Sequence, residues 1–230
     1  MGFDAVAALL TTVVALVLTL VMGLQYASRR RTHALWWSIS FLATAVAAFL
    51  QFMALTSGTW NEGTFRLYVM LAAAIPALMG AGSMYLLWRR LAPVYTAVAL
   101  VFIALGAVGA LSASLTPALL SNVMKASSEV TVVLPSAMLI TAFAVLGTIG
   151  GAALVLGALW SLIRTKQLFN LGIIIGGIVF SLADTLAGNG VAALFFAAQI
   201  VGILAIFIAV RASQQTQAAS QAERAPEAHN

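Results

Sequence analysis

The chain has 230 residues, of which 63% are hydrophobic and 7% are charged, and its mean hydropathy is +1.06. Soluble domains carry about 25% charged residues, so a surface this poor in charge requires lipid as its surrounding solvent. The net charge of +5 lies in short clusters between apolar runs, which fits membrane topology and excludes a nucleic-acid-binding surface. The absence of cysteine excludes disulfides, thiolate metal sites and a cysteine nucleophile. We therefore expect a multi-pass protein of the cell membrane, in contact with the lipid bilayer.

Seven apolar runs are long enough for a membrane-spanning helix, which needs about 20 residues. They cover residues 3–27, 34–56, 65–88, 92–113, 136–160, 168–187 and 191–210. Backbone amides within lipid must be paired inside their own segment, so each run is expected to be helical. The first run precedes a basic cluster instead of following one, which is the reverse of a signal peptide, so we expect it to be retained. The predicted fold class is an all-α bundle of seven transmembrane helices over residues 1–211.

Basic residues in the loops predict the orientation of this bundle. Clusters follow the first, third, fifth and seventh runs, at Arg29, Arg30, Arg31, Arg89, Arg90, Arg164, Lys166 and Arg211. The opposite loops hold Arg66 and Lys125, with Glu62 and Glu129 beside them. Lys and Arg collect on the cytoplasmic side of a membrane, so we expect the N-terminus outside and the C-terminus inside.

Two segments differ from ordinary spans. Residues 114–135 form a longer outer loop, in which residues 117–129 are expected to form a short interfacial helix. Residues 212–230 are rich in Gln, Ala and Ser and contain too few apolar residues to pack. We expect them to form a disordered cytoplasmic tail.

Asp184 is the most informative polar residue, because it lies near the outer end of the sixth run. Ionisable groups within spans are rare and usually face the bundle interior or water. Arg66 begins the third run on the same side, so we expect these two residues to form the charged pair of an outward-facing ligand pocket. The other residues assigned to this pocket are Glu62, Gln51, Tyr68, Asn189 and Gln199. The simpler alternatives are that Asp184 caps a helix end at the headgroup level, and that Gln199 makes an interhelical hydrogen bond.

Pairs of glycines four residues apart occur in the fifth and sixth runs, at Gly147 and Gly151 and at Gly172 and Gly176. Small residues at this spacing let two helices approach closely in lipid. We expect the two runs to pack against each other through these glycines, with a homodimer contact as the alternative. Pro76, within the third run, is expected to kink its helix.

Several chemistries are excluded by what the sequence lacks. His33 lies in the first inner loop and His229 in the tail, so the chain cannot build a bis-histidine haem site inside the bundle. No His and Glu cluster has metal-ligand spacing, and no serine or threonine has a buried histidine base beside it. We expect no enzymatic activity, no cofactor and no metal.

Seven helices with this orientation resemble the rhodopsins, and Arg66 ahead of Pro76 is similar to a microbial rhodopsin third helix. A retinal protein needs a lysine in its last helix, whereas Lys125 and Lys166 both lie in loops, so retinal is excluded. The size and orientation are also similar to those of seven-helix sugar transporters of the SWEET type, but the Pro-Gln signature of that family is absent.

A further resemblance, over residues 29–87, is to a broad group of bacterial multi-helix membrane proteins. It rests on Thr32-His33 after the basic loop, Trp37, Trp60, Phe65-Arg66-Leu67-Tyr68 and Gly82-Ser83-Met84-Tyr85-Leu86-Leu87. That group has no established activity, so the resemblance implies architecture alone.

Two classes of function follow from these patterns. The first is a transporter or sensor that binds a small molecule or ion in the outer polar pocket. The second is a structural or accessory subunit that packs against a partner protein in the membrane. A transporter requires a polar pathway that continues toward the inner half, whereas an accessory subunit is expected to have a dry inner half and an exposed strip of small residues.

Overall fold

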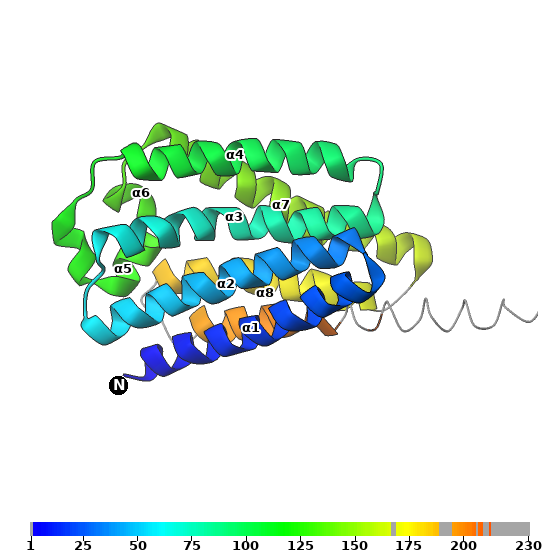
Figure 1. The fold of residues 1–230 in the computed structure, drawn as a ribbon, viewed down its shortest axis with the longest axis horizontal. Coiled ribbons are helices and arrows are strands. Elements are labelled where there is room, and N and C mark those ends of the chain that lie inside the picture. The colour runs from blue at the N-terminus through cyan, green and yellow to red at the C-terminus, as the bar shows by residue number, and fades with distance from the viewer. Residues whose placement is uncertain (1, 167–168, 189–194, 206, 209–211, 213–230) are drawn as a thin grey trace, which may run out of the picture.

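The computed structural model describes residues 2–166, 169–188, 195–205, 207, 208 and 212. For Thr165, Phe169 and residues 180–188, the backbone alone is described. Every regular element in these ranges is a helix (Figure 1). The predicted all-α bundle is therefore confirmed for the part of the chain that the structure describes.

Five of these helices are long and apolar enough to cross a membrane. They are α1 (Phe3–Arg29), α2 (Thr32–Ser57), α3 (Glu62–Leu87), α4 (Ala92–Ser112) and α7 (Ala137–Thr165). The shortest, α4, has 21 residues, which at a rise of 1.5 Å per residue matches the roughly 30 Å hydrocarbon core of a bilayer. The chain is a multi-pass membrane protein.

The predicted count of seven spans is corrected to five in the described ranges. The sixth run forms α8 (Phe169–Gly188), and the seventh is helical from residue 195, but their apolar stretches are Asn170–Val179 and Phe195–Ala205. Each is between 10 and 17 residues long, which is short of a full span. The side chains of residues 180–188 are not described, and residues 189–194 and 209–210 of these runs lie outside the described ranges, so the described apolar stretches are shorter than the predicted runs. The predicted tail, except Ala212, also lies outside the described ranges.

The outer loop contains three short helices instead of the single helix predicted over residues 117–129. They are η1 (Pro117–Ser121), α5 (Val123–Ser128) and α6 (Val130–Val133). The side chain of Asn122 accepts a hydrogen bond from the backbone nitrogen of Lys125, at 3.1 Å, and so starts a new helix within the predicted one. In Figure 1 these short helices lie at the same end of the bundle as the N-terminus.

α3 is central to the bundle, because it packs against α2, α4 and α7. It crosses α7 closely where Gly150 lies against Pro76. A Cβ atom at Gly150 would lie 2.7 Å from the Ala77 nitrogen and closer still to the Pro76 carbonyl group. Glycine is therefore required for these two helices to approach at this depth. By contrast, α1 and α4 expose many large apolar side chains, such as Leu20 and Val101, as expected for surfaces that face lipid.

Candidate functional site

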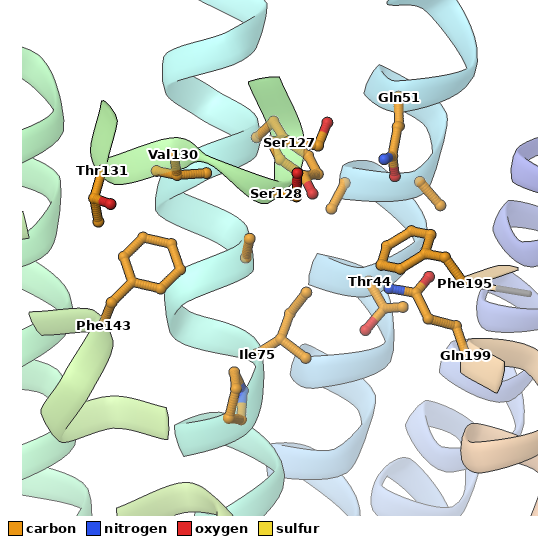
Figure 2. Close-up of a pocket in the computed structure, with 15 residues that line it drawn as sticks. Thr44, Gln51, Ile75, Ser127, Ser128, Val130, Thr131, Phe143, Phe195 and Gln199 are labelled. Carbon is orange, nitrogen blue, oxygen red and sulfur yellow. The ribbon is translucent and has the colours of Figure 1, made fainter. Parts of the chain in front are cut away.

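A cavity of about 240 Å³ lies inside the bundle, between α2, α3, α7, the outer loop and the helix that begins at residue 195 (Figure 2). Its polar lining residues are Thr44, Gln51, Tyr68, Ser127, Ser128, Thr131 and Gln199. Its apolar lining residues are Ala47, Ala48, Ala72, Ile75, Pro76, Val130, Phe143 and Phe195. An apolar cavity with a few converging polar groups is the usual form of a small-molecule site.

The wall from α2 follows directly from helical spacing. Thr44, Ala47, Ala48 and Gln51 recur at three- and four-residue intervals, so they share one face of the helix. Gln51 is 2% exposed, and its Nε2 donates to the Met124 sulfur of α5 at 3.7 Å. This donor reaches the outer loop, so the amide connects α2 to the segment that closes the outer side of the cavity.

The wall from α3 includes Tyr68, Ala72 and Pro76, again at a four-residue spacing. Proline has no backbone N–H, so the carbonyl oxygen of Ala72 lacks the donor that it would have in a regular helix. Two other carbonyl groups near the proline receive side-chain donors: Ser40 donates to the Ile75 oxygen at 3.2 Å, and Tyr95 to the Ala77 oxygen at 3.1 Å. Pro76 therefore adds a backbone acceptor to the polar groups around the cavity, and the kink expected at this residue stays a prediction.

Gln199 and Phe195 supply the wall from the last described helix. They are four residues apart and lie on the same face. Figure 2 shows the amide of Gln199 directed toward Thr44, with the Phe195 ring beside it. Within the described ranges, the Gln199 amide makes no hydrogen bond, so both its donor and its acceptor are available to a ligand.

The outer side of the cavity is formed by Ser127, Ser128 and Thr131, and Trp60 holds this segment in place. The Trp60 backbone nitrogen donates to the Leu120 oxygen at 3.0 Å, and its indole Nε1 donates to the Val123 oxygen at 3.1 Å. The indole also packs against the rings of Phe65 and Tyr68, with centroid distances of 5.4 and 5.0 Å. One aromatic cluster thus fixes both the outer loop and Tyr68.

No described residue of the inner half lines the cavity. Trp37, Phe41 and Met79 lie beyond Thr44 and Pro76, and each is 0% exposed. The rings of Trp37 and Phe41 are in contact, with centroids 5.8 Å apart. The polar lining therefore ends near the middle of the bundle, and close packing follows.

The structure brings together three of the residues predicted for a ligand pocket: Gln51, Tyr68 and Gln199. Arg66 and Glu62 instead pair with each other at 2.8 Å, at the other side of α3. The guanidinium of Arg66 also donates to the carbonyl oxygens of Ala110, Leu111 and Ala113 at the end of α4. The side chain of Asp184 and the whole of Asn189 lie outside the described ranges, so the Asp184–Arg66 pair stays a prediction.

Other lining residues were missed by the sequence analysis. Thr44 was detectable, because it shares a helix face with Gln51. Ser127, Ser128 and Thr131 come from short helices without useful periodicity, so no pattern in the sequence places them at the cavity.

The four glycines predicted to pack the fifth run against the sixth lie on α7 and α8. A Cβ atom at Gly147 or Gly151 would meet no described atom within 4 Å, so these two positions on α7 face open space. Gly176 is buried and Gly172 is half-buried on α8. The nearby Gly177 faces Leu154 and Val155 of α7. The close approach on α7 is made by Gly150, toward α3.

Within the ranges described, no group of three or more His, Cys, Asp or Glu side chains is placed to hold a metal ion. No protein-family model matches the chain, and neither the curated proteins nor the solved structures include a significant match.

Proposed function

We propose that this membrane protein binds a small, uncharged, hydrogen-bonding molecule in the cavity between α2, α3 and α7. The observation that carries the proposal is the lining itself: two glutamine side chains, Gln51 and Gln199, in a cavity whose described lining includes no charged residue. Placing a charged ligand there without a partner charge would be costly, which favours a neutral one. The cavity has room for a molecule somewhat larger than benzene, because an apolar cavity of about 150 Å³ already accommodates benzene.

The packed inner half favours binding over conduction in this conformation. A transporter in which the cavity is an outward-facing site requires Trp37, Phe41 and Met79 to separate in a second state. A sensor or receptor requires no such opening, so it is the simpler use of the cavity.

We further propose that the end of the bundle containing Arg29, Arg30 and Arg31 is cytoplasmic, which places the N-terminus outside. Three helices, α1, α3 and α7, finish at this end in Figure 1, and each is followed by basic residues. Positive charge collects on the cytoplasmic side of membranes. The cavity then lies in the outer half, as the sequence led us to expect.

The test of the binding proposal is native mass spectrometry of the purified protein. Ala72→Phe places an aromatic ring in the cavity, whereas Ala104→Phe places the same ring on an exposed position of α4. We expect a small molecule to copurify with the wild type and with Ala104→Phe and to be absent from Ala72→Phe. A wild-type spectrum without any bound small molecule, or an adduct that survives Ala72→Phe, would contradict the proposal.

A second candidate function is a structural subunit that packs through α7 against another copy of this chain, favoured by the positions of Gly147 and Gly151, where a Cβ atom would meet no described atom within 4 Å. Thr148 is exposed on the same part of this helix. The natural chain has no cysteine, so Thr148→Cys introduces a single thiol. Oxidative crosslinking at Thr148→Cys but not at a matched Ala104→Cys variant would support a contact between two copies, and no crosslinking at either would count against it.

A further inference from the structure

A second pocket, of about 220 Å³, lies at the opposite end of the bundle from the outer loop. Its lining residues are Arg31, Thr32, His33, Tyr85, Leu86 and Arg89, and we refer to it as the arginine pocket. It joins the turn between α1 and α2 to the turn between α3 and α4, because Arg31 and Arg89 come from these two turns. The pocket therefore depends on the folded bundle, since the two arginines are far apart in the sequence.

Among the described residues, neither arginine of this pocket forms an ion pair. The ion pairs in the described part of the chain are Arg66 with Glu62 and Lys125 with Glu129. The acidic side chains described, Asp4, Glu62 and Glu129, belong to the end of the bundle that holds the N-terminus and the outer loop. Two guanidinium groups that share a pocket repel each other unless an anion lies between them.

The remaining polar groups of the pocket are donors suited to the same anion. The Nε2 atom of His33 is shielded from solvent and has no hydrogen-bond partner among the described residues. A histidine nitrogen in this position donates a hydrogen bond when it carries the proton. Thr32 begins α2 and Tyr85 lies on the last turn of α3, so each brings a hydroxyl group to the lining. Leu86 supplies one apolar side.

We propose that the arginine pocket binds a phosphate group. Arginine matches the geometry of phosphate with two parallel N–H donors, and two arginines with a histidine and two hydroxyls provide enough donors for several phosphate oxygens. The position favours the headgroup of an anionic phospholipid. α2 begins at Thr32 and α3 ends at Leu87, so the pocket lies where the spans reach the headgroup region. Trp36 and Trp88, close by in the sequence, are typical of that interface.

The test is a titration of purified protein, followed by native mass spectrometry, with a matched pair of double variants. Arg31→Gln combined with Arg89→Gln removes both guanidinium groups of the pocket. Arg29→Gln combined with Arg90→Gln removes the same charge from the end of α1 and from the turn between α3 and α4, at exposed positions outside the lining. Phosphatidic acid in phosphatidylcholine mixed micelles is one probe, and inorganic phosphate in lipid-free detergent is the other.

We expect the wild type and the Arg29/Arg90 variant to bind one phosphatidic acid in preference to phosphatidylcholine. The Arg31/Arg89 variant should lose about ten-fold or more in affinity, because charge-assisted hydrogen bonds are removed. The same dependence on the variants with inorganic phosphate alone would identify a free phosphate as the occupant. Equal losses in the two double variants would show diffuse charge attraction and overturn the proposal, as would failure of both probes to bind.

Tyr85→Phe keeps the proposal testable if the charge variants do not fold. It removes one hydroxyl group from the lining without a change of charge. We expect a measurable drop in the affinity for the phosphate probe, with an unchanged elution profile in size-exclusion chromatography. Wild-type affinity of Tyr85→Phe for both probes would then overturn the proposal.

Discussion

Replacement of Arg66 by leucine should destabilise the bundle because it removes the cap on the end of α4. The last four carbonyl groups of a helix have no partner within it, and the C-terminal end carries partial negative charge. Arg66 satisfies the oxygens of Ala110 and Leu111 and also that of Ala113, at 3.0 Å. Its side chain is 14% exposed, so these bonds are largely shielded from water.

The expected loss of stability in Arg66→Leu depends on which hydrogen-bond partners of Arg66 are shielded from water. A hydrogen bond from a charged donor contributes about 1.5–3 kcal/mol, and bonds that share one cation do not add fully, so we expect a loss of about 3 kcal/mol. Glu62 is 60% exposed, and such ion pairs contribute about 0–1 kcal/mol. Glu62→Gln should therefore cost far less than Arg66→Leu.

The assay is reversible unfolding of the purified protein in mixed detergent micelles, followed by tryptophan fluorescence. Trp60 precedes Arg66 by six residues in the sequence, so its fluorescence reports on this end of the bundle. A loss in Glu62→Gln as large as that in Arg66→Leu would refute the capping argument. A double-mutant cycle with Asp184→Asn measures the pair predicted from the sequence: a coupling energy near zero would contradict that pair.

Three further substitutions test the packing and the cavity. Gly150→Ala should lower the free energy of unfolding by about 1–3 kcal/mol, because the added Cβ would collide with the α3 backbone, whereas Gly147→Ala should leave it unchanged. Equal changes in the free energy of unfolding for the two variants would contradict the close approach of α3 and α7 at Gly150. Trp60→Phe keeps an aromatic ring but removes the hydrogen bond to the Val123 oxygen, so the rate of amide hydrogen exchange should rise in residues 117–128 and stay unchanged in α4. An unchanged exchange rate in residues 117–128 would show that the indole does not hold the outer loop. Gln199→Leu should weaken the binding of the copurifying molecule by about ten-fold, whereas Gln25→Leu, outside the cavity lining, should leave the affinity unchanged. Equal affinities in the two variants would exclude the Gln199 amide as a contact of the bound molecule.

Composition and run length were sufficient to predict the five long helices, because a chain in lipid must pair its backbone within each segment. The bounds of α2 and α4 agree with the predicted runs to within two residues at each end. Run length predicted full spans for the sixth and seventh runs, whereas their described apolar stretches, Asn170–Val179 and Phe195–Ala205, are shorter. It also failed in the outer loop, where a single side chain, Asn122, divides the predicted helix.

The site was predictable in part, for a similar reason. Gln51, Tyr68 and Gln199 are conspicuous because polar side chains are rare in apolar runs, and all three line the cavity. Arg66 was equally conspicuous but caps α4, since charge alone does not identify which neighbour a side chain meets. Gly150 was not singled out, because a glycine needed for a crossing looks the same in the sequence as Gly147, which faces open space.

The contact between Pro76 of α3 and Gly150 of α7 can form only after α7 has been synthesised, so it is a late step in the assembly of the bundle. Pro76 leaves the ribosome well before Gly150, and the cavity wall at Phe195 and Gln199 is made later still. α1, α2 and α3 can associate as neighbours in the bilayer while synthesis continues, as expected when helices insert first and pack afterwards. A nascent chain that stops before residue 195 lacks the cavity wall at Phe195 and Gln199, so a ligand can stabilise only a chain that already includes this wall.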